Sequence, residues 1–205
     1  MISYIIASHD RDVLERNLLN SLHLQDGDEL IIAEGAPSIA LAYNQGATDA
    51  NNQICCYIHH DVQILDSQGL RAALLRHCTP KIGMVGVIGS RTPVVPWWEG
   101  DTLGAVVDAR MGLLNFGPGG ECAYLDGLLL ATAQDVVWDE SYPGFHLYDH
   151  DACEQMRRRG LANLCLTDGH ELVRHNTRGS GDTSQLDGWD EGVARFWRKW
   201  GDHAA

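Results

Sequence analysis

The sequence predicts an α/β fold whose N-terminal half contains a mostly parallel sheet. Three apolar runs, at residues 2–7, 29–33 and 54–58, have the length and composition of buried strands. Segments with apolar residues at helical spacing separate these runs. Because the order is strand, helix, strand, helix, strand, we expect a right-handed Rossmann-like unit.

Composition limits the classes of function. The 205 residues suit one domain, which can bury a large core without disulfides or a structural metal. The chain has 28 acidic and 15 basic residues, and its formal net charge of −13 argues against binding nucleic acid or an anionic membrane surface. The six cysteines are dispersed without a CxxC pair, and no signal peptide or membrane-spanning run is apparent. We therefore expect a soluble cytoplasmic protein with reduced cysteines.

Each helix expected in the first half follows a residue that can cap it. The capping side chains accept hydrogen bonds from the first free N–H groups of a helix, and they are Asp10, Ser38 and Ser67. Apolar residues then recur at helical spacing over residues 13–22, 39–47 and 70–77. A fourth strand is expected at residues 82–88.

The second half has more turns. Residues 91–100 contain two prolines, which fix φ and remove backbone donors, so we expect a long loop. Its adjacent Trp97 and Trp98 either cover the core or form a lid over a site. Residues 116–120 lack the lysine-containing pattern of a phosphate-binding P-loop, so their glycines indicate a turn. Residues 123–132 predict a strand interrupted at Gly127.

The most informative motif is His59-His60-Asp61, which follows the third expected strand. The carboxyl ends of parallel strands form the ligand-binding edge of such sheets. If the strand continues to Asp61, the side chains of His59 and Asp61 share one face and that of His60 lies on the other. One imidazole and one carboxylate are a partial site for a divalent cation, and the alternative is a strand end with solvated histidines.

Several further motifs occur in a familiar order. They are Leu41-Ala42-Tyr43-Asn44-Gln45-Gly46, His59-His60-Asp61, Trp138-Asp139-Glu140, Gly144-Phe145-His146, Tyr148-Asp149-His150-Asp151, Arg157-Arg158-Arg159-Gly160, Val173-Arg174-His175-Asn176 and Gly179-Ser180-Gly181. Over about residues 2–180, this order resembles family 2-like glycosyltransferases of the GT-A fold. The streptomycin-biosynthesis-type branch is the most similar.

The resemblance implies one GT-A-like domain over residues 1–205, with a nucleotide-binding half at 1–89 and an acceptor-side half at 90–205. It implies inverting transfer from a nucleotide-diphosphate sugar to an unknown saccharide, lipid or small-molecule acceptor, with Mn²⁺ or Mg²⁺ as cofactor. The resemblance implies that Asp149 is the catalytic residue. The donor nucleotide residues are Ala7, Ser8, Glu34, Asn44 and His60; the metal ligands are His59, Asp61 and His175; the acceptor side is Asp126, Gly127, Asp139, Glu140 and His146; the lid is Trp97 and Trp98.

This chain departs from the family pattern at several of these positions. The proline-containing phrase at the end of the first strand is Ala7-Ser8-His9-Asp10 here, and the acidic pair after the second strand is reduced to Glu34. His59 replaces the first aspartate of the DxD motif, and imidazole suits manganese better than magnesium. Tyr148 replaces the glutamate that often precedes the catalytic aspartate, whereas Asp149 is retained.

Several residues have two interpretations. Asp149 is either a general base or the N-cap of a helix at residues 152–159. Asp151 in the first turn either compensates the helix dipole or tunes Asp149 by its charge, and Asp139 and Glu140 either line the acceptor side or cap a turn. His146 and His150 either contact the acceptor or cover the loop, and Arg178 reaches either phosphate or solvent. His175 ends a short strand expected to begin at residue 171.

The chain closes with an amphipathic helix from Asp190, whose aromatic stripe docks on the core or on a partner in a homodimer. Two rival functions are kept. One is a noncatalytic sugar-nucleotide or carbohydrate-binding module on the same fold. The other is a zinc hydrolase using His59, His60 and Asp61, which is weaker because no HExxH-like helix is present.

Overall fold

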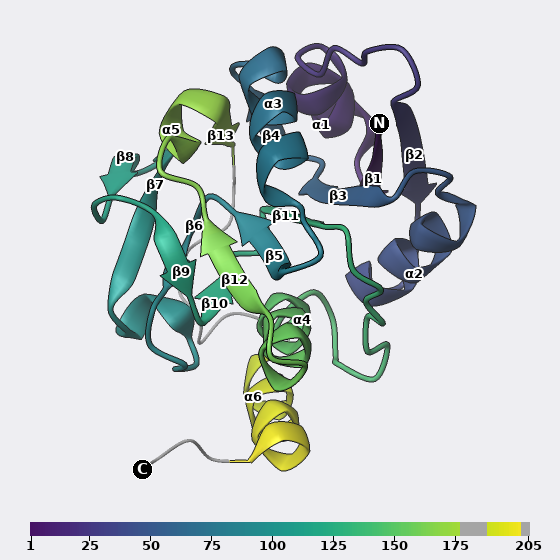
Figure 1. Ribbon diagram of the computed structural model, residues 1–205. Helices are drawn as coiled ribbons and strands as arrows, with labels where there is room; N and C mark the ends of the chain where they lie inside the picture. The colour runs from purple at the N-terminus through teal and green to yellow at the C-terminus, as the bar shows by residue number, and fades with distance from the viewer. Residues whose placement is uncertain (177–187, 202–205) are drawn as a thin grey trace.

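The computed structural model describes residues 1–176 and 188–201 (Figure 1). Its centre is a seven-stranded mixed sheet, which confirms the predicted α/β class. In spatial order the strands are β2 (Glu29–Glu34), β1 (Ile2–Ser8), β3 (Ile54–His59), β11 (Leu129–Thr132), β5 (Ile82–Gly86), β12 (Ala162–Cys165) and β9 (Gly120–Cys122). The pairs β1–β2 and β1–β3 are parallel, as the alternating order of strands and helices predicts, and the pair β5–β12 is parallel as well.

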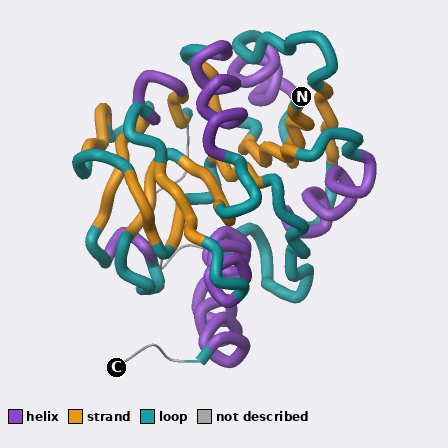
Figure 2. Tube along the Cα trace, viewed as in Figure 1, coloured by secondary structure: helices purple, strands orange, loops and turns teal. Residues whose placement is uncertain are grey.

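A second sheet lies beside the first (Figure 2). Its strands, in spatial order, are β10 (Tyr124–Leu125), β6 (Ile88–Ser90), β7 (Thr102–Asp108), β13 (Val173–His175) and β4 (Val62–Ile64), and β8 (Gly112–Asn115) pairs with β7. Two segments predicted as single strands therefore divide between the sheets. The strand expected at residues 82–88 becomes β5 and β6, and the one expected at 123–132 becomes β10 and β11 with Gly127 in the connection.

Helices cover both faces of the large sheet. The first helical segment is α1 (Arg11–Leu14) continued by the π-helical η1 (Glu15–Leu19), and α2 (Ile39–Asp49) packs on β1 and β2. The others are α3 (Ser67–His77), which packs on β5, and α4 (Tyr148–Arg158), which packs on β5 and β12. In Figure 1, α1 and α3 lie above the sheet and α2 and α4 below it.

Two of the three predicted helix caps are confirmed. The carboxylate of Asp10 accepts a hydrogen bond from the Val13 N–H at 3.0 Å, and the Ser38 hydroxyl accepts one from the Leu41 N–H at 3.2 Å. The third prediction was wrong, because Asp66 caps α3 by accepting from the Gly69 N–H at 2.9 Å. Ser67 is the first helical residue, and its hydroxyl instead accepts from the His23 N–H at 2.9 Å.

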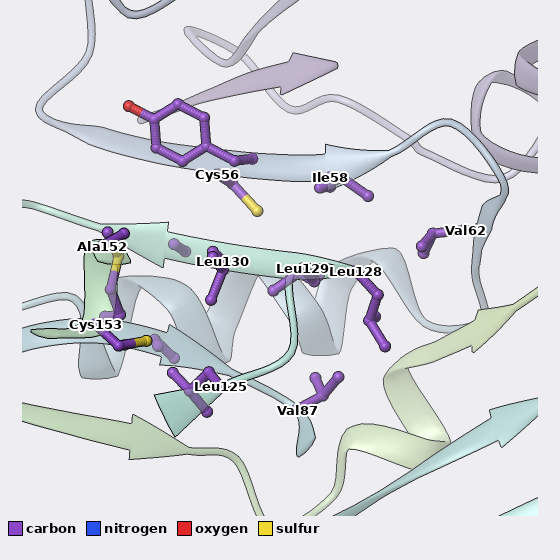
Figure 3. Close-up of a cluster of buried hydrophobic side chains, with 14 of the residues drawn as sticks. Cys56, Ile58, Val62, Val87, Leu125, Leu128, Leu129, Leu130, Ala152 and Cys153 are labelled. Atoms are coloured by element: carbon purple, nitrogen blue, oxygen red, sulfur yellow. The ribbon is translucent and has the colours of Figure 1, made fainter. Parts of the chain in front are cut away.

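Buried apolar side chains of the large sheet and of the helices, α4 among them, form one core cluster. Figure 3 shows Cys56 and Ile58 of β3 near Leu129 and Leu130 of β11. All six cysteines are free thiols, as predicted, and Cys55 alone is not fully buried. Among the described residues, none of the helices has both the length and the apolar character needed to cross a membrane.

The C-terminal segments differ in part from prediction. The strand expected to begin at residue 171 starts instead at Val173, because residues 169–172 form the short helix α5 (Gly169–Leu172). Gly169 allows this packing, since a Cβ there would lie 2.6 Å from the Ala105 carbonyl oxygen. The closing helix α6 (Trp189–Trp200) docks on the core through the fully buried Phe196.

Candidate metal centre and donor pocket

Three side chains from separate segments meet at the carboxyl end of β3. His59 is the last residue of β3, Asp61 follows it in a turn, and His175 is the last residue of β13. One ligand atom from each of the three lies within 4.8 Å of the other two. The antiparallel pairing of β13 with β4 brings His175 there, and the Asn176 N–H donates to the Asp61 carbonyl oxygen at 2.9 Å.

Asp61 is brought close to His59 by a turn and not along an extended strand, which differs from our expectation. The strand ends at His59 and residues 60–61 form a turn, so the premise of an extended strand to Asp61 was wrong. The turn still separates His60 from the cluster, and the His60 Nδ1 lies 3.2 Å from the Ser8 hydroxyl. The zinc set of His59, His60 and Asp61 is therefore not the one that assembles here.

The Asp61 carboxylate has an unusual environment. Its Oδ1 is buried, and no hydrogen-bond donor from the described residues reaches it. The His175 Nε2 lies 3.5 Å away, which is the separation of an ion pair when this imidazole is protonated and is too long for a firm hydrogen bond. Burial raises the pKa of Asp61, but His175 and His59 outweigh burial and hold this pKa below its ordinary value. The site therefore offers an ionised carboxylate oxygen that has no hydrogen-bond donor among the described residues.

The two imidazoles respond to this carboxylate in opposite ways. Burial lowers the pKa of His59, which keeps the ring neutral at pH 7 and able to donate a lone pair. Burial also lowers the pKa of His175, but the neighbouring Asp61 raises it more, and the net shift is upward. The Asp108 carboxylate lies 3.8 Å from His175 Nδ1 on the side away from Asp61.

Tyr148 connects the cluster to α4. Its hydroxyl lies 2.5 Å from the His59 Nε2, and its ring is buried against Tyr43 and Trp138. Gly127 leaves room for this hydroxyl, since a Cβ at residue 127 would lie 2.0 Å from it. Sequence reasoning noted Tyr148 only as a departure from the family pattern.

Asp149 is held by three hydrogen bonds. Its Oδ1 accepts from the N–H and the Nδ1 of His150, both at 2.8 Å, and its Oδ2 accepts from the Gly127 N–H at 3.1 Å. Burial raises the pKa of Asp149, but His150 and the backbone donors outweigh it and the net pKa is lowered. The alternative of an N-cap was wrong, because α4 begins at Tyr148 and Asp149 lies within its first turn.

A pocket of about 160 Å³ lies beside the cluster. Its lining includes the predicted nucleotide residues Ala7, Ser8 and His60 and the cluster residues His59 and Asp61. It also includes His9 and Phe145, which sequence reasoning did not assign, although His9 directly follows the first strand. The rings of His9 and His60 are 4.4 Å apart.

Two predicted nucleotide residues are not part of this pocket. Glu34 is exposed and pairs with Arg11 at 2.8 Å. The Asn44 side chain donates to the Trp138 carbonyl oxygen at 2.9 Å and to Glu140 Oε1 at 2.7 Å. Asn44 thus anchors the segment that follows β11. The asparagine that matched the family pattern therefore has a structural role in this chain.

The predicted acceptor residues divide into separate groups. Gly127 contacts Asp149, and Asp126 precedes it in the same turn. Asp139 instead binds Lys199 at 2.8 Å, and Asp139 and Glu140 line a second, open pocket of about 520 Å³ formed with α6. His146 packs its ring 5.8 Å from that of Trp189.

The predicted lid is mostly anchored. Trp97 is buried in the short helix η2 (Trp97–Glu99), whereas Trp98 is 43% exposed. The Trp98 ring stacks on that of Trp189, with centroids 5.7 Å apart. Trp97 is therefore core, and only Trp98 has the exposure expected of a lid.

Asp151 does more than compensate a helix dipole. Its buried carboxylate accepts from Trp200 Nε1 at 2.7 Å, from Lys199 Nζ at 3.0 Å and from the Tyr142 hydroxyl at 3.0 Å. The bonds from Trp200 and Lys199 attach α6 to α4. Arg178 and the small-residue run Gly179-Ser180-Gly181, both assigned from sequence, lie outside the described residues.

One comparison with known proteins identifies the family of this chain. A profile of the family described as "Glycosyltransferase like family" matches residues 3–197. No curated protein sequence matches the chain significantly. The crystal structure of A197 from STIV is similar at 13% sequence identity with a TM-score of 0.48, over 86% of this chain and 85% of that one. The chain belongs to this glycosyltransferase-like family, and its mixed α/β architecture is GT-A-like.

Proposed function

We propose that the protein transfers a sugar from a nucleotide-diphosphate donor to an acceptor hydroxyl, with a divalent cation held by His59, Asp61 and His175. The observation that carries this proposal is the ligand cluster beside a pocket at the ends of β1 and β3, in a member of a glycosyltransferase-like family. Membership of the streptomycin-biosynthesis-type branch and inversion remain predictions from the resemblance.

The residues of the cluster fit a divalent cation. Two imidazoles are suitable ligands, and so is a buried carboxylate oxygen that has no hydrogen-bond partner among the described residues. Imidazole favours Mn²⁺ over Mg²⁺. When bound, such a cation would stabilise the negative charge that develops on the leaving diphosphate. A cation is needed to neutralise the diphosphate, because the chain carries a formal charge of −13 and the described residues that line the pocket include neither lysine nor arginine.

The pocket suits the nucleoside part of the donor. Ala33, Ala36 and Ile39 give it an apolar wall, and the rings of His9, His60 and Phe145 give it aromatic surface. A base can stack on such rings, while the neighbouring cluster is in reach of the diphosphate.

Asp149 would accept the proton of the attacking hydroxyl. Among the described residues, its Oδ1 has two donors, whereas Oδ2 has one and retains a lone-pair direction for a substrate. A rigid carboxylate with one available oxygen is the geometry that general-base catalysis needs.

Calorimetry with uridine and guanosine diphosphates tests the metal-bridged site. We expect binding in Mn²⁺ to be much tighter than in chelator, and Asp61→Ala should abolish that difference. His60→Ala is the matched control, because His60 lines the pocket but lies outside the cluster: it should weaken binding while preserving the metal effect. Equal affinity in Mn²⁺ and in chelator would overturn the proposal.

Turnover separates an enzyme from a noncatalytic binding module, which remains the alternative because His59 replaces the family's aspartate. Asp149→Asn should lower turnover by about 10²–10⁴-fold with donor affinity nearly unchanged. Asp126→Asn removes the carboxylate in the adjacent turn and should cost less. A larger loss at Asp126 would show that the base is misassigned, and metal-dependent binding without turnover would favour the module.

A further inference from the structure

We infer that His150 is a positioning residue, which fixes the orientation of the Asp149 carboxylate and ties it to the loop of residues 91–100. This inference rests on the proposed role of Asp149 as the base. His150 was predicted only to contact an acceptor or to cover a loop, but its ring is 2% exposed and both ring nitrogens have partners.

The two partners determine where the imidazole carries its proton. The Trp97 backbone N–H donates to His150 Nε2 at 3.2 Å. A backbone N–H can only donate, so Nε2 must be the unprotonated nitrogen. The neutral ring then carries its proton on Nδ1, which donates to Asp149 Oδ1 at 2.8 Å. The opposite tautomer would place two N–H groups against each other at Trp97 and two acceptors against each other at Asp149.

The surroundings leave the ring little freedom to turn. It packs against the rings of Tyr124 and Phe196, with centroids 5.1 Å and 6.2 Å away. Both neighbours are completely buried. Hydrogen bonds in such a dry environment are strong, and a partner left unmatched there is costly.

The two carboxylate oxygens of Asp149 therefore have different roles. The bonds from His150 use both the ring and the backbone N–H, and they draw negative charge to Oδ1. Among the described residues the opposite oxygen accepts from Gly127 alone, and it is left to face a hydroxyl. Rotation of the carboxylate would break three hydrogen bonds at once.

The connection to the loop is through backbone rather than side chain. Trp97 begins the short helix η2 after Pro96, and the adjacent Trp98 stacks on Trp189 at the start of α6. The position of the loop therefore sets the tautomer of His150 and, through it, the available oxygen of Asp149. A histidine present only for packing would not need bonds of opposite polarity at its two nitrogens.

Two substitutions can separate the two bonds. The amide nitrogen of an asparagine lies as many bonds from Cβ as Nδ1 does, so His150→Asn can keep the donor to Asp149 while losing the acceptor for Trp97. The amide oxygen of a glutamine corresponds in the same way to Nε2, so His150→Gln can keep the Trp97 bond while losing the donor to Asp149. Both replace an aromatic ring by an amide in the same cavity.

The kinetic test uses the full chain with Mn²⁺ and the most reactive member of a panel of uridine, guanosine and thymidine diphosphate sugars, with water as acceptor. Water attacks the anomeric carbon, Asp149 takes its proton, and the nucleoside diphosphate leaves. We expect His150→Gln to lower kcat about tenfold or more with KM for the donor unchanged, and His150→Asn to lose clearly less. His23→Gln, at an exposed position, is the control for general effects.

A spectroscopic test does not depend on activity. Long-range ¹H–¹⁵N NMR of the wild-type protein should show His150 as the neutral Nδ1–H tautomer, with the signal assigned by its loss in His150→Asn. An Nε2–H tautomer, or equal kcat in the Gln and Asn variants, would overturn the inference. If Asp149→Asn leaves turnover intact while the Nδ1–H tautomer is seen, the proposed base fails and not the His150 geometry.

Discussion

The Tyr148 hydroxyl lies 2.5 Å from the His59 Nε2 and so joins the first turn of α4 to the end of β3. A ligating imidazole is oriented by the hydrogen bond that its other nitrogen makes. With Nε2 held by Tyr148, Nδ1 is the nitrogen left for a cation. Tyr148 thus stands where the family often has a glutamate. Its hydroxyl can orient His59 without itself being a ligand of the cation.

Tyr148→Phe removes only this hydroxyl, and we expect it to weaken Mn²⁺ binding about 10–100-fold, the usual effect of losing such an outer contact. Isothermal titration with Mn²⁺ measures it. Tyr43→Phe is the control, because the Tyr43 hydroxyl is buried without a partner among the described residues, and its removal should leave the affinity unchanged. Equal effects of the two variants would contradict the role of Tyr148.

Gly127→Ala should disturb the same contact from the opposite side. The new Cβ would lie 2.0 Å from the Tyr148 hydroxyl oxygen and 2.5 Å from Cζ, so the ring must move. We expect a loss of about 1–3 kcal/mol of stability in urea unfolding, together with weaker Mn²⁺ binding. Combining it with Tyr148→Phe removes the nearest clashing atom, so the double variant should be more stable than the sum of the single losses. Strict additivity would show that the strain lies elsewhere.

The thiols should be unreactive in the native state. Burial raises the pKa of Cys78 and of Cys165 to about 12 each, and it raises the pKa of the other four thiols as well. Ellman's reagent should therefore react slowly with the folded protein and with six thiols after unfolding in urea. Cys55, which is half-buried, should react first. Rapid reaction of one of the five buried thiols would contradict the packing of the core.

The N-terminal half could be predicted well because its signals are local. Apolar runs, helical periodicity and a side-chain cap at Asp10 or Ser38 all act within a few residues. The predictions that failed concern positions at which the chain leaves one sheet and pairs with strands of the other. The apolar stretch through Val87 contains no turn residue apart from glycine, yet its two ends pair in different sheets, which depends on strands far away in sequence.

The candidate site shows the same division. The motif at residues 59–61 and His175 could be found from sequence because their residue types are chemically distinctive, and the structure brings three of these four residues together. By residue type, Asn44 and Asp139 were equally plausible site residues. In the structure, however, Asn44 anchors a loop and Asp139 anchors α6. Sequence could not separate these cases, since the partners Trp138 and Lys199 are 94 and 60 residues away.

The attachment of α6 should weaken in acid. Burial raises the pKa of Asp139, but its hydrogen bonds with Lys199 and Ser141 outweigh burial and lower the pKa from 3.8 to about 2. A carboxyl whose pKa is lowered by folding contributes stability that is fully present above its unfolded value, and that is lost as the pH falls toward the folded value. The contribution of Asp139 should therefore disappear between about pH 4 and pH 2.

Urea unfolding of the wild type and of Asp139→Asn, followed by tryptophan fluorescence, measures this contribution. At pH 7 the variant should be less stable by about 1 kcal/mol, because a partly buried ion pair and its hydrogen bonds are lost. The difference should shrink as the pH falls through 3.8, since the wild-type carboxyl then takes up a proton too. Asp101→Asn is the control, because Asp101 is 64% exposed and pairs with Arg91 at 3.4 Å, and it should change stability little at any pH. A difference between wild type and Asp139→Asn that stays constant down to pH 2 would show that Asp139 does not hold α6 through its charge.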